Sequence, residues 1–253
     1  MWLNKLFFWS VIVLSMSACV QQTTTNPYNK DSSAIKQARA HTELGAAYLK
    51  ERKFAIALEE FNIATEIAPD YALAYNGLGM VNAALGETAK ADAAYQKAIA
   101  LEPNNSESHN NYGNFLCTNG RYDESITHFL AAIKNPLYVT PHLAYTNAGI
   151  CSLRKKDTVN AEKYFINALQ IEPLNPVAAY QLANIQFDRG DAQSAQRTLQ
   201  NVVISSPNPE SLWLGVKIER QLGNKDNEAS YAIQLRKLFP NARETQLLIN
   251  SQP

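Results

Sequence analysis

The sequence lacks an excess of charge of either sign. Its 23 Lys and Arg side chains equal its 23 Asp and Glu side chains in number, so neither a basic surface suited to nucleic acid nor an acidic tail stands out. The composition therefore predicts a partner that is not a nucleic acid.

Recognisable catalytic and metal-binding motifs are also missing. Cysteine occurs three times and histidine four times, with no HExxH, CxxC or G-x-S-x-G pattern among them. We expect no catalytic residue, no metal site, no cofactor and no small-molecule substrate, and hence a protein that is not an enzyme.

No apolar run is long enough to span a membrane. The longest near the start covers residues 6–16, well short of the ~20 residues that a spanning helix needs. Lys5 precedes it and the small pair Ser17-Ala18 follows it, which is typical of a signal peptide over residues 1–18.

Ser17-Ala18-Cys19 resembles a bacterial lipobox, although Met16 stands where leucine is usual. That resemblance implies acylation of Cys19, and acyl chains on one residue would anchor the protein to a bilayer surface. Val20 at the next position implies, by the sorting rules of such lipoproteins, the outer membrane facing the periplasm. The alternative is an ordinary cleaved signal peptide with a chance cysteine. Residues 19–33 are polar and predict a flexible tether.

A repeating pattern fills the remainder. Gly45, Gly79 and Gly113 follow one another at equal intervals, and Gly149 comes after a slightly longer one. Small residues at the eighth, 20th and 27th repeat positions with a large residue at the 24th match the tetratricopeptide repeat (TPR), a helix-turn-helix unit of about 34 residues. Residues 34–243 therefore predict an all-α, right-handed superhelix of about six such repeats, beginning at Ala38, Ala72, Ser106, His142, Pro176 and Glu210.

The last predicted repeat matches poorly. It keeps Trp213, Ala229 and Pro240 in approximate register but has no glycine at its eighth position. Terminal repeats are expected to be atypical, because one face has no neighbouring repeat. Residues 244–253 are predicted to be a C-terminal tail.

In such a superhelix the first helix of each repeat lines the concave side, and the pattern places asparagine beside apolar residues there. Amide groups can hold a peptide backbone and apolar groups can contact its side chains, so we interpret this face as a protein-binding groove, with a solvated polar face as the alternative. The predicted groove residues are Asn76, Met80, Asn110, Asn114, Thr146, Ile150, Leu153, Tyr180, Asn184 and Phe187.

Two cysteines lie one repeat length apart in adjacent repeats. Cys117 and Cys151 both fall late in predicted first helices. Outside the cytoplasm thiols meet oxidising conditions, which favours a disulfide between them if their Cα atoms approach within ~7 Å. Two small buried thiols are the alternative.

The region from Asn110 to Arg154 resembles one particular family. Asn111-Tyr112-Gly113, Phe115-Leu116-Cys117, the loop Asn135-Pro136-Leu137-Tyr138 and Asn147-Ala148-Gly149-Ile150-Cys151 are together similar to the type IV pilus biogenesis and stability lipoproteins, the PilF/PilW family.

This resemblance implies a pilotin-like adaptor in type IV pilus (fimbria) biogenesis. Its partner would be the outer-membrane secretin subunit, which it would help to assemble and localise, and its acyl chains (palmitate) would hold it in the membrane. The rival interpretations are an outer-membrane TPR lipoprotein that gathers cell-wall enzymes, and an unfamiliar enzyme acting on peptidoglycan.

Overall fold

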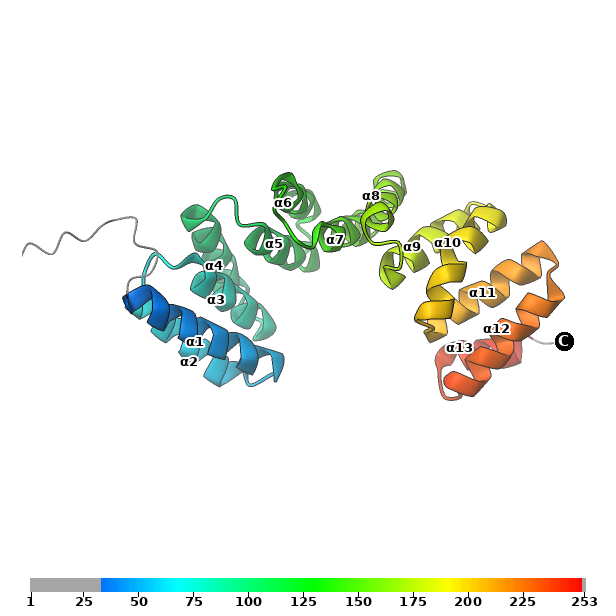
Figure 1. The fold of residues 1–253 in the computed structure, drawn as a ribbon, viewed down its shortest axis with the longest axis horizontal. Helices are drawn as coiled ribbons and strands as arrows, with labels where there is room; N and C mark the ends of the chain where they lie inside the picture. Colours follow the sequence, from blue (N-terminus) through cyan, green and yellow to red (C-terminus); the bar gives the residue numbers. More distant parts are fainter. Residues whose placement is uncertain (1–32, 252–253) are drawn as a thin grey trace, which may run out of the picture.

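The computed structural model describes residues 33–251, which form thirteen α-helices and no strand (Figure 1). The helices are α1 (Ser33–Lys50), α2 (Phe54–Ile67), α3 (Ala72–Ala84), α4 (Thr88–Leu101), α5 (Ser106–Thr118), α6 (Tyr122–Lys134), α7 (Pro141–Arg154), α8 (Thr158–Ile171), α9 (Pro176–Asp188), α10 (Ala192–Ser205), α11 (Pro209–Leu222), α12 (Lys225–Leu238) and α13 (Arg243–Asn250). The first twelve pair into six helix-turn-helix units, which confirms the predicted fold class.

Asparagine and proline set where several first helices begin. The side chains of Asn105, Asn175 and Asn208 each accept a hydrogen bond from the backbone of the third residue that follows, capping α5, α9 and α11. Proline opens α7, α9 and α11, where its missing N–H costs nothing because the first turn has no intrahelical acceptor for it.

The turn inside each repeat requires a left-handed residue. Gly86, Gly120 and Gly190 occupy it with φ between 77° and 90°, a conformation open to glycine without steric cost. In repeats one and four the equivalent residues are Arg52 and Lys156, with φ of 61° and 67°. These two turns therefore carry a conformational cost that the others avoid.

Within a repeat, an aromatic ring lies over a glycine of the preceding helix. A Cβ atom added to Gly79 would meet the ring of Tyr95 at 2.6 Å, and one added to Gly113 would meet the ring of Phe129 at 2.7 Å. Alanines beside these rings are fully buried. The small residues let the two helices approach, and the ring fills the space between them.

The last two repeats vary this contact. In repeat five, Ala183 and Leu199 replace the glycine and the ring, and both are buried. In repeat six the eighth position counted from Glu210 holds Lys217, not glycine, as the sequence indicates, but Gly215, two residues earlier, makes the packing contact. A Cβ atom added to Gly215 would lie 3.0 Å from the ring of Tyr231. The spacing from Ala183 to Gly215 is shorter than one repeat, because the connection before α11 is short. The register of the sixth repeat is shifted as a result, and Ala229, expected to be a buried packing residue, is exposed.

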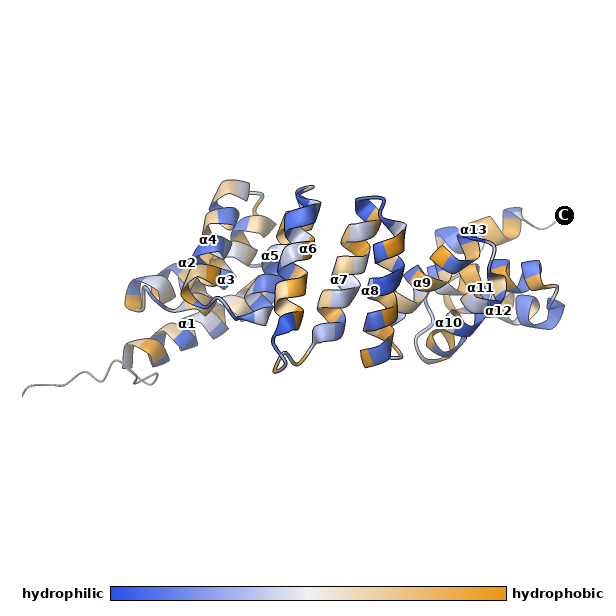
Figure 2. Ribbon diagram, turned by 90° about the horizontal axis from the view of Figure 1, so that it is seen from above, coloured by the Kyte–Doolittle hydropathy of each residue, from blue (hydrophilic) through white to orange (hydrophobic). Residues whose placement is uncertain are grey.

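The repeats stack into an arch whose inner side is formed by first helices. Helix α3 contacts α1 and α5, and α7 contacts α5 and α9, whereas among the described residues no second helix contacts the second helix of a neighbouring repeat. Figure 1 shows α5 and α7 on the inner side of the arch with α6 and α8 outside them. Hydrophilic and hydrophobic residues alternate along the helices (Figure 2), as expected when each buries one side only.

The predicted signal peptide, the predicted acylation site Cys19 and nearly all of the predicted tether lie outside the described residues. Within residues 33–251, no helix is both long and apolar enough to cross a bilayer. Part of the predicted C-terminal tail is ordered as α13, which packs on α11 and α12 through the buried Leu248.

Candidate functional site: the inner face of the arch

All ten predicted groove residues lie on first helices, but they differ in exposure. Asn76, Asn110 and Thr146 are buried, Met80 and Asn114 are exposed, and the other five are half-buried. The predicted face therefore divides into a part that holds repeats together and a part that a partner can reach.

The three buried polar residues link neighbouring repeats. Asn111 Nδ2 donates to Asn76 Oδ1 at 3.4 Å, and Asn147 Nδ2 donates to Asn110 Oδ1 at 3.0 Å. Thr146 Oγ1 accepts from Asn175 Nδ2 at 3.0 Å. Because a buried amide oxygen needs a donor, these contacts make the three residues part of the repeat interface and engage the side-chain oxygen of each.

The donors Asn111 and Asn147 are absent from the predicted set. They occupy the sixth position of their repeats, one residue beyond the position chosen for the groove. The sequence does contain an indication of this role, because each of the two asparagines stands two residues before a packing glycine, Gly113 or Gly149. The same position holds Gly77 in repeat two, where a Cβ would meet the ring of Phe61.

Most of the predicted apolar contacts serve the core. Ile150 and Leu153 pack against the cluster shared by α8 and α9, while Tyr180 and Phe187 pack against the cluster of the last repeats. The ammonium of Lys217 also lies 5.1 Å from the centroid of the Phe187 ring. Asn184 is half-buried and donates to Asp188.

Met80 and Asn114 mark the accessible part. Both line a hollow of about 470 Å³ between α3 and α5, together with Phe115 and Thr118. Met80 also lines a second hollow of about 340 Å³, with Leu49 and Leu73, between α1 and α3. The inner face of repeats one to three thus offers apolar contact beside a free amide.

A larger hollow, about 820 Å³, lies where repeats three and four meet. It is formed by the α4–α5 connection, the start of α5, the α6–α7 connection and the start of α7. Its lining residues are Glu102, Pro103, Asn104, Asn105, Ser106, Glu107, Asn110, Asn111, Asn135, Leu137, Tyr138, Val139, Thr140 and Leu143. We call it the junction hollow; of the predicted groove residues, Asn110 alone lines it.

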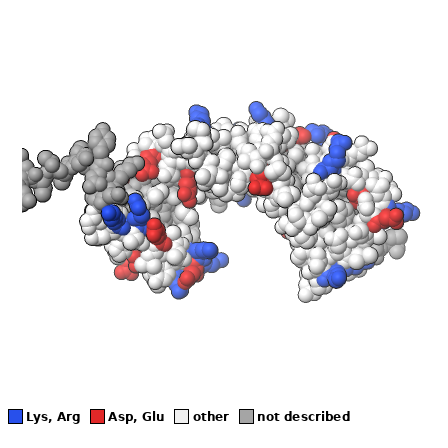
Figure 3. Space-filling model, in the orientation of Figure 1, with Lys and Arg blue, Asp and Glu red and all other residues white. Residues whose placement is uncertain are grey.

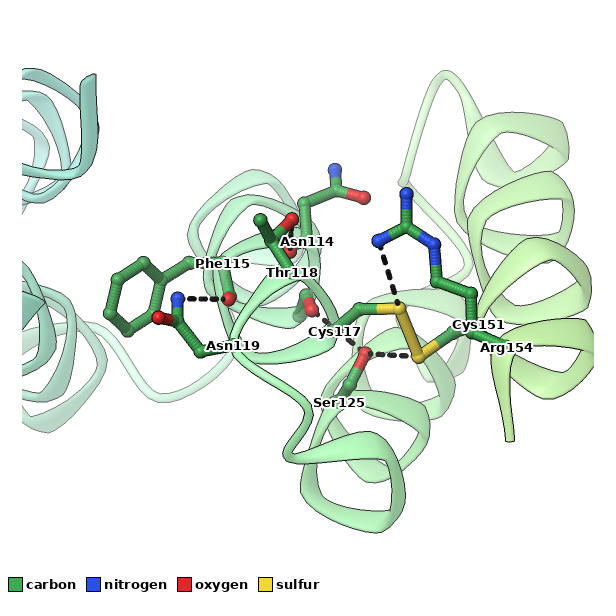
Figure 4. Close-up of a disulfide and its surroundings, with 9 residues drawn as sticks. Asn114, Phe115, Cys117, Thr118, Asn119, Ser125, Cys151 and Arg154 are labelled. Atoms are coloured by element: carbon green, nitrogen blue, oxygen red, sulfur yellow. Dashed lines mark hydrogen bonds between the residues drawn. A yellow bond between two sulfur atoms is a disulfide. The ribbon is translucent and has the colours of Figure 1, made fainter. Parts of the chain in front are cut away.

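Cys117 and Cys151 are joined by a disulfide between α5 and α7, with Cα atoms 5.8 Å apart (Figure 4). Both cysteines are buried. Ser125 Oγ lies 3.3 Å from the sulfur of Cys151 and donates to the Gly113 carbonyl at 2.7 Å. The bond ties the first helices of repeats three and four together near their carboxyl ends, whereas the junction hollow lies at their amino ends.

Two histidines meet inside repeat three. His109 Nδ1 lies 2.8 Å from His128 Nδ1, and His109 Nε2 lies 3.0 Å from the Pro103 carbonyl oxygen. A carbonyl pairs only with a donor, so His109 is protonated on Nε2 and, when neutral, accepts from His128. Burial, and next the charge of His109, lower the pKa of His128 to about 4. Sequence spacing gave no sign of this pair.

Chemically, the inner face offers recognition groups and no assembled catalytic machinery. Over the described residues, no group of three or more His, Cys, Asp or Glu side chains could hold a metal ion. Side chains of both charges are scattered over the face seen in Figure 3, without a large patch of one sign. The arrangement suits a protein ligand better than a polyanion.

Three models of the tetratricopeptide repeat match the chain, over residues 42–106, 94–127 and 152–217. The chain is 29% identical over 237 residues to the type IV pilus assembly protein PilF of Pseudomonas aeruginosa, covering 93% of this chain and 94% of that protein.

Two solved structures are similar as well. The structure of Pseudomonas aeruginosa PilF aligns with a TM-score of 0.78 at 28% identity, covering 87% of this chain and 100% of the other. The structure of PilW, described as a widely conserved type IV pilus biogenesis factor, aligns with a TM-score of 0.72 at 29% identity, covering 84% of this chain and 98% of the other. The similarity spans the whole solenoid and is not confined to single repeats.

Proposed function

Because the chain is a tetratricopeptide repeat protein homologous to the pilus assembly protein PilF, we propose that it acts in type IV pilus biogenesis as a non-enzymatic adaptor. The observation that carries this proposal is the match over almost the full length of both chains. A shared repeat alone would account for short matches, since repeats of this kind serve many unrelated scaffolds.

The partner in this proposal is the subunit of the outer-membrane secretin, the channel through which the pilus leaves the cell. The accessible inner face fits a protein partner, because Met80 and Leu73 give apolar contact and Asn114 gives hydrogen bonding to a backbone. The adaptor would promote assembly of the secretin ring and its placement in the outer membrane.

The proposal includes anchoring through acyl chains on Cys19, facing the periplasm. A polar tether between the anchor and α1 would let the folded part approach a partner at a distance from the bilayer. Labelling cells with an alkyne fatty acid tests this point: the wild-type protein should carry the label in the outer-membrane fraction, and Cys19→Ser should carry none.

Deletion of the chain in its native host tests the function. We expect loss of the heat-resistant secretin multimers on immunoblots and loss of surface pili, with the secretin monomer still produced. Wild-type protein supplied from a plasmid should restore both, and a variant with Met80→Asp and Asn114→Asp should restore neither while reaching the wild-type level. Unchanged multimers and pili in the deletion strain would contradict the proposal.

A further inference from the structure

The junction hollow owes its shape to the irregular step between repeats three and four. The connection between α6 and α7 comprises residues 135–140, whereas the connections before α3, α5 and α9 have four residues each. The added length carries the chain outward and forms one wall of the hollow, opposite the connection between α4 and α5.

This longer connection is held in place by Asn135. Its side-chain oxygen accepts from the Leu137 backbone N–H at 3.0 Å, and its carbonyl accepts from the Tyr138 N–H at 3.1 Å. Its side-chain nitrogen donates across to the Asn104 carbonyl at 3.4 Å. The connection is therefore a formed turn, and its side chains point in defined directions.

Two apolar side chains point from this turn into solvent. Leu137 is 84% exposed and Val139 is 88% exposed, while Tyr138 between them is half-buried. Leu143, also on the lining, is 44% exposed. Apolar side chains fixed in water beside a hollow gain nothing for the fold, and grouped apolar exposure marks interaction sites.

The charge of the hollow is negative. Glu102 and Glu107 are exposed on its lining, no Lys or Arg lines it, and neither carboxylate forms an ion pair with any described Lys or Arg. Glu102 accepts one hydrogen bond, from Asn105 Nδ2 at 2.9 Å. The two uncompensated charges favour a cationic ligand and repel phosphates and other anions.

Amide groups supply the remaining polar lining. The side-chain amide of Asn104 forms no hydrogen bond within the described residues and offers a donor and an acceptor to an extended backbone. The amides of Asn105 and Asn135 each already accept one hydrogen bond and donate one, which leaves each a second N–H. A volume of about 820 Å³ lies within the range usual for ligand pockets.

We propose that the junction hollow binds a short extended segment of a partner protein that carries a Lys or Arg beside apolar residues. The basic side chain would lie near Glu102 and Glu107, and the apolar neighbours would cover Leu137, Val139 and Leu143. This site adjoins the accessible inner face of repeats one to three, since Glu107 also lines the hollow between α1 and α3 and Asn111 also lines the hollow between α3 and α5. The inference does not require that the partner be the secretin.

Photocrosslinking with the full-length chain in its native host tests this site. The photoreactive residue p-benzoylphenylalanine is placed at Val139, and at Val159 on α8, which is 81% exposed, as a control. We expect a protein adduct from Val139 that Val159 does not give, and peptide sequencing of the adduct should show a Lys or Arg flanked by apolar residues.

Charge variants make the result decisive. Glu102→Gln with Glu107→Gln should lower the Val139 adduct yield by roughly 2- to 30-fold, the range for loss of two exposed ion pairs. Glu59→Gln with Glu66→Gln, two exposed carboxylates on α2, should leave it unchanged. Equal protein levels on immunoblots exclude misfolding as the cause.

A synthetic peptide with the crosslinked sequence then measures affinity for the detergent-solubilised full chain. Replacing its basic residue by Gln should weaken binding by a similar factor. The inference would be overturned if Val139 gave only a lipid adduct or no adduct, or if the yield of the Val139 protein adduct were the same with and without Glu102→Gln and Glu107→Gln. Because pilus assembly is not measured, failure at this site is distinguishable from failure of the proposed function.

Discussion

The ring of Phe165 lies against Gly149 so closely that a Cβ atom on the glycine would meet the ring edge at 2.5 Å. Both residues are buried between α7 and α8. The contact is the fourth in a series that begins with Gly45 and Phe61, and it fixes the distance between the two helices of repeat four.

Gly149→Ala should destabilise the protein by roughly 1–3 kcal/mol, because the added methyl group overpacks a filled space. Combining it with Phe165→Leu should cost less than the sum of the single changes, since the double variant recreates the Ala183 and Leu199 combination of repeat five. Urea unfolding followed by circular dichroism measures each free energy. Strict additivity of the two changes would mean that the ring and the glycine do not constrain each other.

Lys156→Gly should stabilise the protein by about 0.5–1 kcal/mol, because a left-handed conformation costs an L-residue energy and a glycine none. Lys156 adopts that conformation, with φ of 67°. Lys163→Gly makes the same change in the exposed middle of α8 and should destabilise by about 1 kcal/mol. Thermal and urea unfolding of the two variants should therefore shift in opposite directions.

Removing the disulfide with Cys117→Ala and Cys151→Ala should cost roughly 2–4 kcal/mol, as expected when a bond between residues 34 apart no longer restricts the unfolded chain. A reducing agent should lower the stability of the wild type by a similar amount and leave the double variant unaffected. Equal stability of oxidised and reduced wild type would contradict the prediction.

The pair of histidines predicts a pH dependence. The pKa of His128 is about 4 in the folded protein and about 6.5 in an unfolded chain, so between these values the unfolded state binds more protons. Stability should therefore fall as pH falls from 6.5 to 4, and this group should contribute no further change below 4.

We expect the free energy of unfolding to fall by roughly 1–2 kcal/mol over this interval because of His128. Burial lowers the pKa of His128, but the ring is only partly shielded from solvent and the carboxylate of Glu124 raises the pKa, so the destabilisation is smaller than for a fully buried histidine. The positive charge of Arg121 lowers the pKa of His128, as burial does. Urea unfolding at pH 7 and pH 4.5 measures it. His128→Gln should lose less stability over this interval than the wild type, whereas His142→Gln, outside the pair, should behave as the wild type does.

The fold could be predicted in detail from the sequence because its rule is local. Small and large residues recur at fixed positions of each repeat, and the first residues predicted for repeats two, three and five begin α3, α5 and α9. The sixth repeat was misread for a physical reason: a connection of three residues before α11 displaces the register, and packing of Gly215 on Tyr231 becomes visible only in three dimensions.

The candidate site was less predictable. The position of each residue within its repeat correctly predicted that all ten lie on first helices. It could not predict that the side chains of Asn76 and Asn110 accept hydrogen bonds from the next repeat. Such bonds depend on the side-chain directions of two repeats at once. The meeting of His109 with His128 and the lining of the junction hollow likewise arise from tertiary packing.

The disulfide has a mechanical consequence. Among the described residues, neighbouring repeats are joined by contacts of each first helix with neighbouring first helices and with the second helix of the repeat before it. The bond between α5 and α7 adds a covalent link at the step between repeats three and four. In a solenoid whose repeats contact only their neighbours, bending is shared among the steps between repeats, so we expect the two arms to bend more easily than the clamped centre.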